Sequence, residues 1–441
     1  MIPVGLSGVV FLLGYAAAST VFAENIDQAW EIALRESRKL QAEASMTAAA
    51  VSTTSAAQAA RLPKVTNATA YTALSDRPDF KATTPDMNLS VFGTQVTIPS
   101  MTFATPLMEK DFLVSTTQAS VPLYTGGKIS SLVEQADAAA RAASAGQITG
   151  VQDLKIGVAE NYLLVLRIQG LVEVLLDTQK AIEAHEKMAQ DMFKQGLVTK
   201  NVLLSAQVAK SDIDQKVIQA KNTLQVAESA YNRFLWRPLT TPVQLELVQI
   251  PSTSGDLGLL TEAALANRSE LRQLAAQSQA VWAKSREHRS ERLPMVGLTG
   301  GYTYVQNEYI TENDYWSATV GMVWSPIDGG VSRSKQRAAE HKATAITKML
   351  DEARSGVELQ VRKCWLEEQD SRERVAVAKK AIERSEENLR MVNHQFQSGL
   401  VTHTEVLDAV ALYTQARMNY CNAAYDAILA TYRLRRATGS L

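Results

Sequence analysis

Side chains that could do chemistry are few in this chain and lie scattered along it. The histidines follow no metal-ligand spacing; they are His185, His288, His341, His394 and His403. The sequence also lacks a glycine-rich phosphate loop, a nucleophile beside a base at motif spacing, and a carboxylate pair isolated in an apolar pocket. We therefore expect no enzyme activity, no cofactor and no metal site. The balance of 45 basic and 46 acidic residues gives no reason to expect nucleic-acid binding.

One acidic pair has an informative spacing. Glu405 and Asp408 are three residues apart in a helical pattern, so they share one helix face near the start of that helix. The helix dipole tolerates carboxylates at this position. A solvated first-turn pair without a further role is therefore an equal alternative to a functional pair.

The acidic pair follows a short stretch that the chain contains twice. Residues 193–206 read FKQGLVTKNVLLSA, and residues 396–409 read FQSGLVTHTEVLDA. Gly196-Leu197-Val198-Thr199 and Gly399-Leu400-Val401-Thr402 have the features of a tight helix–helix turn. Glycine supplies the left-handed conformation that ends one helix, and threonine can cap the next. Leucine and valine in an otherwise polar turn favour a contact surface, although capping alone explains part of the pattern.

Cys364 and Cys421 are the only cysteines, and they lie on either side of the second turn. Their distances from that turn differ by about 22 Å along a helix. A disulfide cannot bridge such a mismatch, so we expect two buried free thiols.

The turns belong to two copies of one larger unit. Residues 26–61 and 257–292 are helical by pattern and end at Arg61-Leu62-Pro63 and Arg292-Leu293-Pro294, where proline stops each helix. The chain therefore divides into a first repeat at 24–236, a proline-containing linker at 237–256 and a second repeat at 257–441.

Residues 1–23 precede the first repeat and have the apolar core and small-residue end of a secretory signal peptide. No Lys or Arg precedes the apolar core, so a buried N-terminal helix is the alternative. No later stretch approaches about 18 uninterrupted apolar residues, so we expect no transmembrane helix in the mature chain.

Each repeat next changes to a strand-like composition. VTNATAYTAL follows Pro63, and MVGLTGGYTYV follows Pro294. In residues 315–325 the apolar side chains fall on one face, which carries Trp316, Ala318, Val320, Met322 and Trp324. This alternation is typical of a lipid-facing strand, and also of a half-buried strand in a soluble sheet. FLVSTTQASVPLY, the matching segment of the first repeat, does not reveal its faces.

The strands run into a proline and a double glycine, which lets the chain turn sharply into a helix. These junctions are Pro122, Gly126 and Gly127 in the first repeat and Pro326, Gly329 and Gly330 in the second. Helical patterns follow over 128–195 and 332–398, each about 100 Å long. Their apolar residues step by three and four, and the last helix carries two such rows. A helix with a neighbour on each side belongs to a sheet of helices that can close into a cylinder.

The repeats differ between their strands. The first repeat has extra residues around 75–110, which contain Pro78, Pro85, Pro99 and Pro106 and show little periodicity. We expect an exposed, irregular loop at the end of the strands, dispensable for assembly.

The doubled helix–strand–strand–helix–helix unit, the PLYTGG and PIDGG junctions and the doubled GLVT turns resemble the TolC-like outer membrane efflux proteins, or outer membrane factors, over essentially the whole mature chain. The resemblance implies an α+β membrane protein of the bacterial outer membrane. It would be a homotrimer with four strands per subunit in one 12-stranded transmembrane β-barrel, continuous with a long periplasmic α-helical barrel. Four strands cannot close a membrane barrel alone, and lipid tolerates no open edge, so inserted strands require oligomerisation.

The resemblance also implies a function. The chain would be the passive exit duct of a tripartite efflux or type I secretion system, surrounded by outer membrane lipids. A periplasmic adaptor protein and an inner-membrane transporter would be its partners. The GLVT turns would form the periplasmic tip that meets the adaptor.

Glu405 and Asp408 stand where the family has two aspartates that narrow the periplasmic entrance. Three subunits would join these carboxylates into a ring that attracts cations and binds multivalent ones. In the family's best-known member a Tyr and an Arg also hold the entrance shut. Phe396 and Val401 stand in their places here, so we expect that latch to be absent or built differently.

The heptads leave one alternative from another class, a periplasmic coiled-coil structural protein without a pore. The strand segments and the one-sided face from Trp316 to Trp324 favour the duct.

Overall fold

The structure is a computed structural model that describes residues 23–250 and 255–441. The predicted signal peptide therefore lies outside the described residues, apart from Ala23, as does part of the predicted linker. The chain forms two compact units. The bundle unit contains the residues up to Ala42 together with Ile148–Arg268 and Arg354–Leu441, and the sheet unit contains Glu43–Gln147 and Ser269–Ala353.

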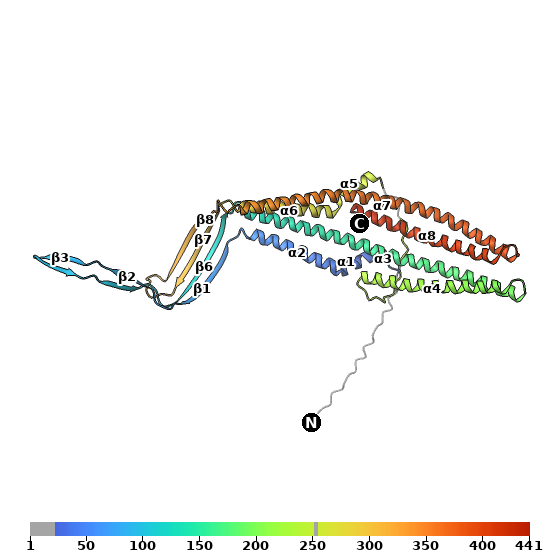
Figure 1. Ribbon diagram of the computed structural model, residues 1–441, viewed down its shortest axis with the longest axis horizontal. Coiled ribbons are helices and arrows are strands. Elements are labelled where there is room, and N and C mark those ends of the chain that lie inside the picture. The colour runs from blue at the N-terminus through green and yellow to red at the C-terminus, as the bar shows by residue number, and fades with distance from the viewer. Residues whose placement is uncertain (1–22, 251–254) are drawn as a thin grey trace, which may run out of the picture. The chain divides into compact units, whose positions relative to one another are not determined.

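The order of the elements repeats itself, as the sequence predicts (Figure 1). The first repeat has the helices α1 (Ile26–Glu36), α2 (Arg38–Ala59), α3 (Lys128–Lys194) and α4 (Lys200–Phe234), with β1 (Lys64–Ala73) and β6 (Asp111–Tyr124) between α2 and α3. The second has α5 (Leu257–Asn267), α6 (Ser269–Ser290), β7 (Met295–Val305), β8 (Asp314–Val323), α7 (Val331–Gln397) and α8 (His403–Thr438). The helices predicted over 128–195 and 332–398 are confirmed to within one residue at each end.

The first helix of each repeat is broken, whereas the pattern predicted one continuous helix. Ser37 separates α1 from α2 and Arg268 separates α5 from α6, each with an extended backbone. The Ser37 hydroxyl accepts the Leu40 N–H at 3.3 Å and so restarts the helix. The buried Arg268 guanidinium donates to the Gln360 side chain at 2.9 Å and to the Ala437 carbonyl at 3.1 Å. Contacts distant in sequence accompany the second break, and local periodicity cannot report them.

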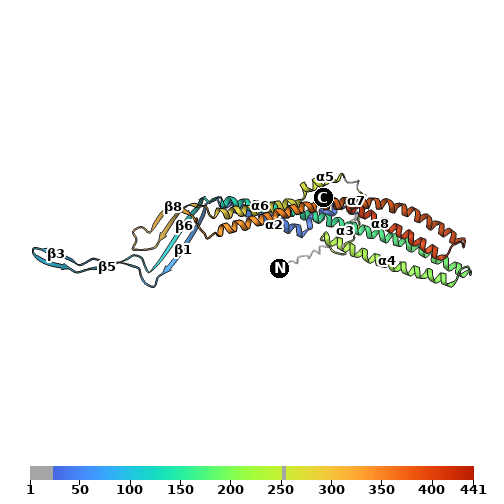
Figure 2. The same ribbon diagram turned by 45° about the horizontal axis from the view of Figure 1, so that its top comes forward.

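The segment 75–110 is not the irregular loop that we expected. It forms a β-ribbon, in which β2 (Asp79–Thr83) pairs with β5 (Thr102–Pro106) and β3 (Met87–Val91) pairs with β4 (Thr94–Ile98), both antiparallel (Figure 2). The overlooked signal was the period-two alternation of MNLSV and TQVTI. The prolines that suggested a loop lie at or beyond strand ends, where they remove no central ladder bond.

The other strands form one antiparallel sheet in the order β1-β6-β7-β8. Its edge strands, β1 and β8, have no strand partner on their outer sides within the described chain. The described helices include none that is long and apolar enough to cross a membrane.

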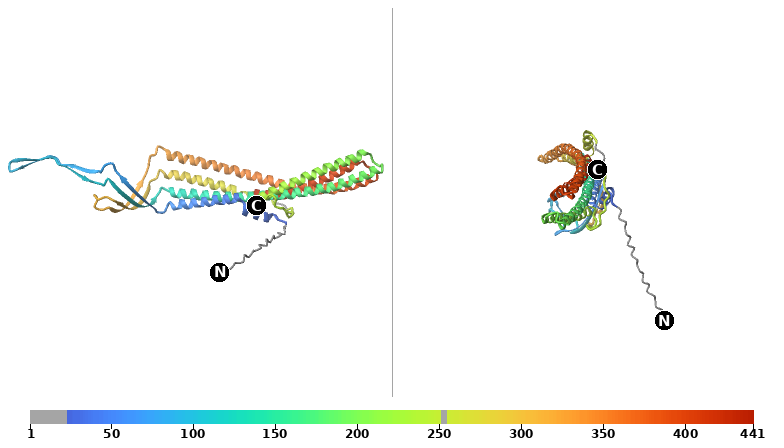
Figure 3. Two further views of the ribbon diagram at one scale, coloured as in Figure 1. Left: turned by 90° about the horizontal axis from the view of Figure 1, so that it is seen from below. Right: turned by 90° about the vertical axis from the view of Figure 1, so that its right-hand side faces the viewer.

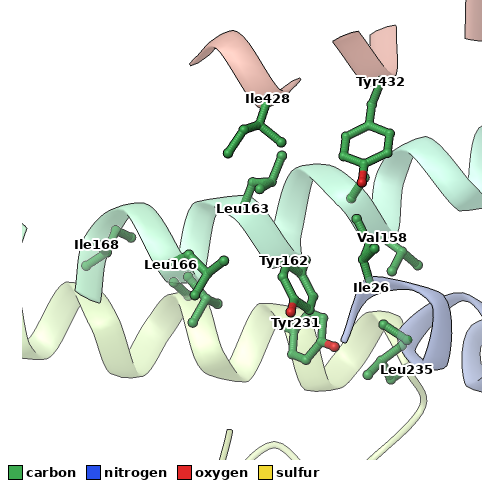
Figure 4. Close-up of a cluster of buried hydrophobic side chains, with 14 of the residues drawn as sticks. Ile26, Val158, Tyr162, Leu163, Leu166, Ile168, Tyr231, Leu235, Ile428 and Tyr432 are labelled. Carbon is green, nitrogen blue, oxygen red and sulfur yellow. The ribbon is translucent and has the colours of Figure 1, made fainter. Parts of the chain in front are cut away.

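The bundle unit has a continuous core where α1, α3, α4 and α8 meet (Figure 4). Tyr162 of α3 is central: its ring contacts Tyr231 edge-on at 6.0 Å, and its hydroxyl lies 2.7 Å from the carbonyl oxygens of Glu24 and Glu246. Arg237 donates to both carboxylate oxygens of Glu24 at 2.9 Å. The start of the first repeat and the linker are thus joined to each other and to Tyr162 of α3.

Candidate functional site

The two GLVT turns lie at the same end of the bundle unit and share one backbone design (Figure 3). Gly196 and Gly399 have left-handed φ values of 74° and 70°. The N–H groups of Leu197 and Leu400 each bond at 2.9 Å to the carbonyl five residues earlier, which is the Schellman arrangement. The two leucine side chains are 64% and 75% exposed. The turns therefore present apolar side chains to any partner at this end.

The two threonines begin their helices differently. Thr402 and Glu405 form a reciprocal capping box: the Glu405 N–H donates to the Thr402 hydroxyl at 3.4 Å, and the Thr402 N–H donates to the Glu405 carboxylate at 3.1 Å. Thr199 makes no side-chain cap bond, and Val202 occupies the position matching Glu405. The Glu405 carboxylate therefore has a local structural role besides its charge.

Glu405 and Asp408 are both exposed on α8, beside a buried stripe that includes Val406 and Ala409. The structure thus places both carboxylates on one face of the helix, as their spacing predicts, and this face is exposed. Within one chain their positions fit a solvated first-turn pair and a cation-attracting pair equally well.

A buried histidine pair lies just inside the second turn, and no motif in the sequence singles it out. His185 Nε2 of α3 and His403 Nδ1 of α8 are 2.6 Å apart, and the rings stack at 4.7 Å. Burial, and secondly the neighbouring His403, lower the pKa of His185 to about 4, and burial also lowers the pKa of His403. The Phe396 ring packs 5.2 Å from His185.

This histidine pair joins the first residue of α8 to α3 and so fixes the helix that carries Glu405 and Asp408. The two histidines belong to different repeats, so no local spacing could reveal their contact. Phe396 is buried in this cluster at 5% exposure. The described residues contain no group of three or more potential metal ligands.

The strand–helix junctions have the backbone that their glycines allow. Gly126, Gly127, Gly329 and Gly330 all have positive φ, and a Cβ on Gly126 would lie only 2.6 Å from the Cβ of Leu293. Pro122 lies at a shift in the β6–β7 register, and Pro326 lies between β8 and α7. In the second junction Asp328 accepts the N–H groups of Gly330 and Ser332, and bonding to Ser332 lowers the pKa of the Asp328 carboxyl.

The strand register sorts the sheet into two unlike faces. The aromatic face carries Val65, Asn67, Thr69, Tyr71 and Ala73 of β1, Asp111, Leu113, Ser115, Thr117, Ala119 and Val121 of β6, Val296, Leu298, Gly300, Tyr302 and Tyr304 of β7, and Asp314, Trp316, Ala318, Val320 and Met322 of β8. The hydroxyl face carries mainly small or polar residues, among them Thr66, Thr116, Gln118, Ser120, Thr299, Gly301, Thr303, Ser317, Thr319 and Gly321.

Polar side chains of β1 and β6 on the aromatic face form hydrogen bonds with one another. The Asn67 amide donates to the Thr117 hydroxyl at 2.8 Å, and the hydroxyls of Thr69 and Ser115 are 2.9 Å apart. Paired polar groups of this kind cost much less in an apolar environment than unpaired ones. The register therefore shows which residues of β6 lie on each face, whereas the sequence of β6 alone did not reveal this.

A sheet with one apolar, aromatic face, one polar face and two open edges, joined to helices of 67 residues, defines the class of protein. It is a membrane β-sheet with a long α-helical extension. The chain matches the outer membrane efflux protein family over residues 30–233 and 260–440, and it belongs to this family.

The individual relatives agree with this assignment. Outer membrane protein TolC of Vibrio cholerae is 25% identical over 351 residues, which are 76% of this chain and 78% of the relative. The fold is similar to that of VceC from Vibrio cholerae, with a TM-score of 0.77 at 16% identity, covering 94% of this chain and 96% of that one. It is also similar to CusC, with a TM-score of 0.80 at 15% identity, covering 94% and 92%.

The chain is therefore an outer membrane efflux channel with a periplasmic helical extension, and its family is not enzymatic. The family match favours this function over the poreless coiled-coil scaffold.

Proposed function

We propose that three copies of the chain assemble into one channel, the exit duct of a tripartite efflux or type I secretion system. The sheet carries this proposal. Trp316, Val320 and Met322 on its aromatic face are 81%, 69% and 64% exposed in the single chain. Pairing of β1 in one copy with β8 in the next would remove the open edges. The aromatic face would then meet lipid, and the hydroxyl face would line a water-filled lumen.

The helices of the bundle unit support the same assembly. Each long helix already packs on one side, as the Thr178–Thr414 hydroxyl pair at 2.8 Å and the Arg417–Asp177 ion pair at 2.8 Å illustrate for α3 and α8. Large apolar side chains remain exposed elsewhere on α4 and α7: Val208, Ile218, Val226, Leu359, Leu366 and Val377. Neighbouring copies would cover them and close the helices into a barrel.

Two sites follow for such a duct. The exposed leucines of both GLVT turns would contact the periplasmic adaptor, which links the duct to an inner-membrane transporter. Glu405 and Asp408 of the three copies would form a carboxylate ring that narrows the periplasmic entrance and attracts cations.

The proposal is tested by purifying the full chain from outer membranes, measuring its native mass and recording its conductance in planar bilayers. We expect a trimer that dissociates on heating and forms cation-selective channels. Recovery as a soluble periplasmic protein, or as a monomer without conductance, would overturn the proposal.

A further inference from the structure

The outer half of the β-ribbon has an apolar face that no part of the described chain covers. The register pairs Met87 with Ile98 and Leu89 with Val96, and Val91 lies on the same side. These five residues are the ribbon's apolar face, and each is at least 37% exposed. The opposite face is polar: the Thr97 hydroxyl donates to the Asn88 side chain at 2.7 Å, and Ser90 lies opposite Gln95.

The tip of the ribbon has a strained backbone and an exposed aromatic side chain. Phe92 and Gly93, with φ values of 51° and 85°, connect β3 to β4 in a two-residue turn. A left-handed conformation at both positions is normally supplied by Asn-Gly or Asp-Gly. A bulky aromatic residue pays a steric penalty there. The Phe92 side chain is also fully exposed. Strain of this kind, next to an uncovered apolar face, points to a contact surface.

We propose that the apolar face is covered by the same ribbon of the other two subunits, so that three ribbons pack together beyond the mouth of the barrel. The inference rests on the proposed trimer. The ribbon extends the β1–β6 hairpin, because the Leu74 N–H donates to the Lys110 carbonyl and the Leu107 N–H donates to the Pro78 carbonyl. β1 is the sheet edge that would pair with the next copy, so the ribbon is continuous with the proposed subunit interface.

Physical chemistry favours the ribbons of the other two subunits as the cover of the apolar face. A two-stranded ribbon is at best marginally stable alone in water, and its open edges and apolar face need a cover. Three-fold symmetry would bring identical ribbons together at one height, each tethered to its own subunit. Tethering raises their effective concentration, so weak apolar contacts suffice.

The charges of the ribbon argue for another copy over a lipid surface. Its charged residues between 79 and 106 are Asp79, Lys81 and Asp86. A segment that binds an anionic lipid surface is expected to carry several Lys or Arg beside its apolar face. The ribbon has one basic residue, and its alternation places Lys81 on the face opposite to Phe80. Ribbons with so little charge can pack against one another without strong repulsion.

The test is cysteine cross-linking in the full-length trimer, in a background in which Cys364 and Cys421 are replaced by alanine. Leu89→Cys lies on the apolar face, and Ser90→Cys, one residue away, lies on the polar face. With a short bis-maleimide linker, we expect a covalent dimer band on a denaturing gel from Leu89→Cys, several-fold stronger than from Ser90→Cys. Absent or equal bands in intact trimers would overturn the ribbon inference alone. Failure of the parent protein to form trimers would instead overturn the proposed function.

A second arm keeps the test independent of cross-linking geometry. The double variant Leu89→Asp, Val96→Asp should expose the ribbon to limited proteolysis in intact trimers, whereas Ser90→Asp, Gln95→Asp should not. Equal cleavage of both variants would contradict the inference. It would also be overturned if a fluorophore at Leu89→Cys in reconstituted channels were quenched by brominated lipid, because lipid would then be the cover.

Discussion

Glu405 combines a structural and an electrostatic role in one carboxylate, and substitution can separate the two. Glutamine can keep the capping box while removing the charge. In the double variant Glu405→Gln, Asp408→Asn we expect loss of cation selectivity and of block by trivalent cations in planar bilayers, with unchanged thermal stability.

Thr402→Ala is the matched control for the prediction on Glu405 and Asp408. This variant removes the cap, so the helix should lose about 1 kcal/mol of stability. Both carboxylates remain, so the channel should keep its cation selectivity. Unchanged selectivity and block in the double variant would place the constriction elsewhere.

The lowered pKa of His185 predicts that stability depends on pH at the same end of the bundle unit. Its pKa is about 4 in the folded protein against an ordinary 6.5, so the unfolded state binds the proton first. Stability is therefore fully present above pH 6.5 and falls as the pH drops towards 4, by at most about 3 kcal/mol. Hydrogen exchange of the first turns of α8 at pH 7.5 and pH 5 should show this loss of protection.

His185→Leu should weaken the pH dependence of that protection and leave only the part that comes from His403, whose pKa burial also lowers. His341→Leu, at an exposed histidine of α7, is the control and should leave the dependence unchanged. A pH dependence that is unchanged in His185→Leu would assign the effect to another group.

At the scale of the element, β8 should tolerate a charged residue on one face and be destabilised by a charged residue on the other. Val320 lies on the aromatic face and Thr319 on the hydroxyl face. Val320→Arg should destabilise the inserted barrel by about 2–4 kcal/mol, because arginine would face lipid. Thr319→Arg should leave stability nearly unchanged but reduce cation selectivity, because it would face the lumen. Urea unfolding in detergent micelles and single-channel recordings check both, and the reverse order of stabilities would invert the assigned faces.

The two GLVT turns predict a separation of assembly from transport. In the double variant Leu197→Glu, Leu400→Glu the trimer should form normally, since both side chains are exposed in the single chain. Export should be lost, because charge would replace the proposed apolar contact with the adaptor. Substrate susceptibility of cells and trimer yield measure the two properties.

Gln195→Glu, Ser398→Glu adds the same charges at exposed neighbours of these leucines and should export normally. Normal export by the leucine variant would show that the turns are only helix caps.

At the scale of the whole molecule, the core of the bundle unit and the four-stranded sheet form without the ribbon. Their contacts involve no residue between 79 and 106. Replacing residues 79–106 by a short turn should therefore leave trimer yield and export intact. Heat-modifiable gels and export assays test this, and loss of trimers would show that packing of the ribbons is required for assembly.

The sequence by itself determined the parts of this protein that depend on neighbouring residues. Proline after each short helix, glycine with positive φ at Gly196 and Gly399, and the three-and-four spacing of the long helices act within a few residues. The repeat, the strands, the long helices and the family could therefore be predicted. The shared helix face of Glu405 and Asp408 also follows from a local rule.

Tertiary structure decided what depends on residues far apart in the chain. Arg268 at the break between α5 and α6 donates to Gln360 and Ala437, and the His185–His403 pair joins the two repeats. The faces of β6 required the register with β1 and β7, and the ribbon required β3 to find β4 across a turn that composition does not favour. Pairings of this kind are set by packing between segments rather than by local preference, so the local pattern carries only a weak trace of them.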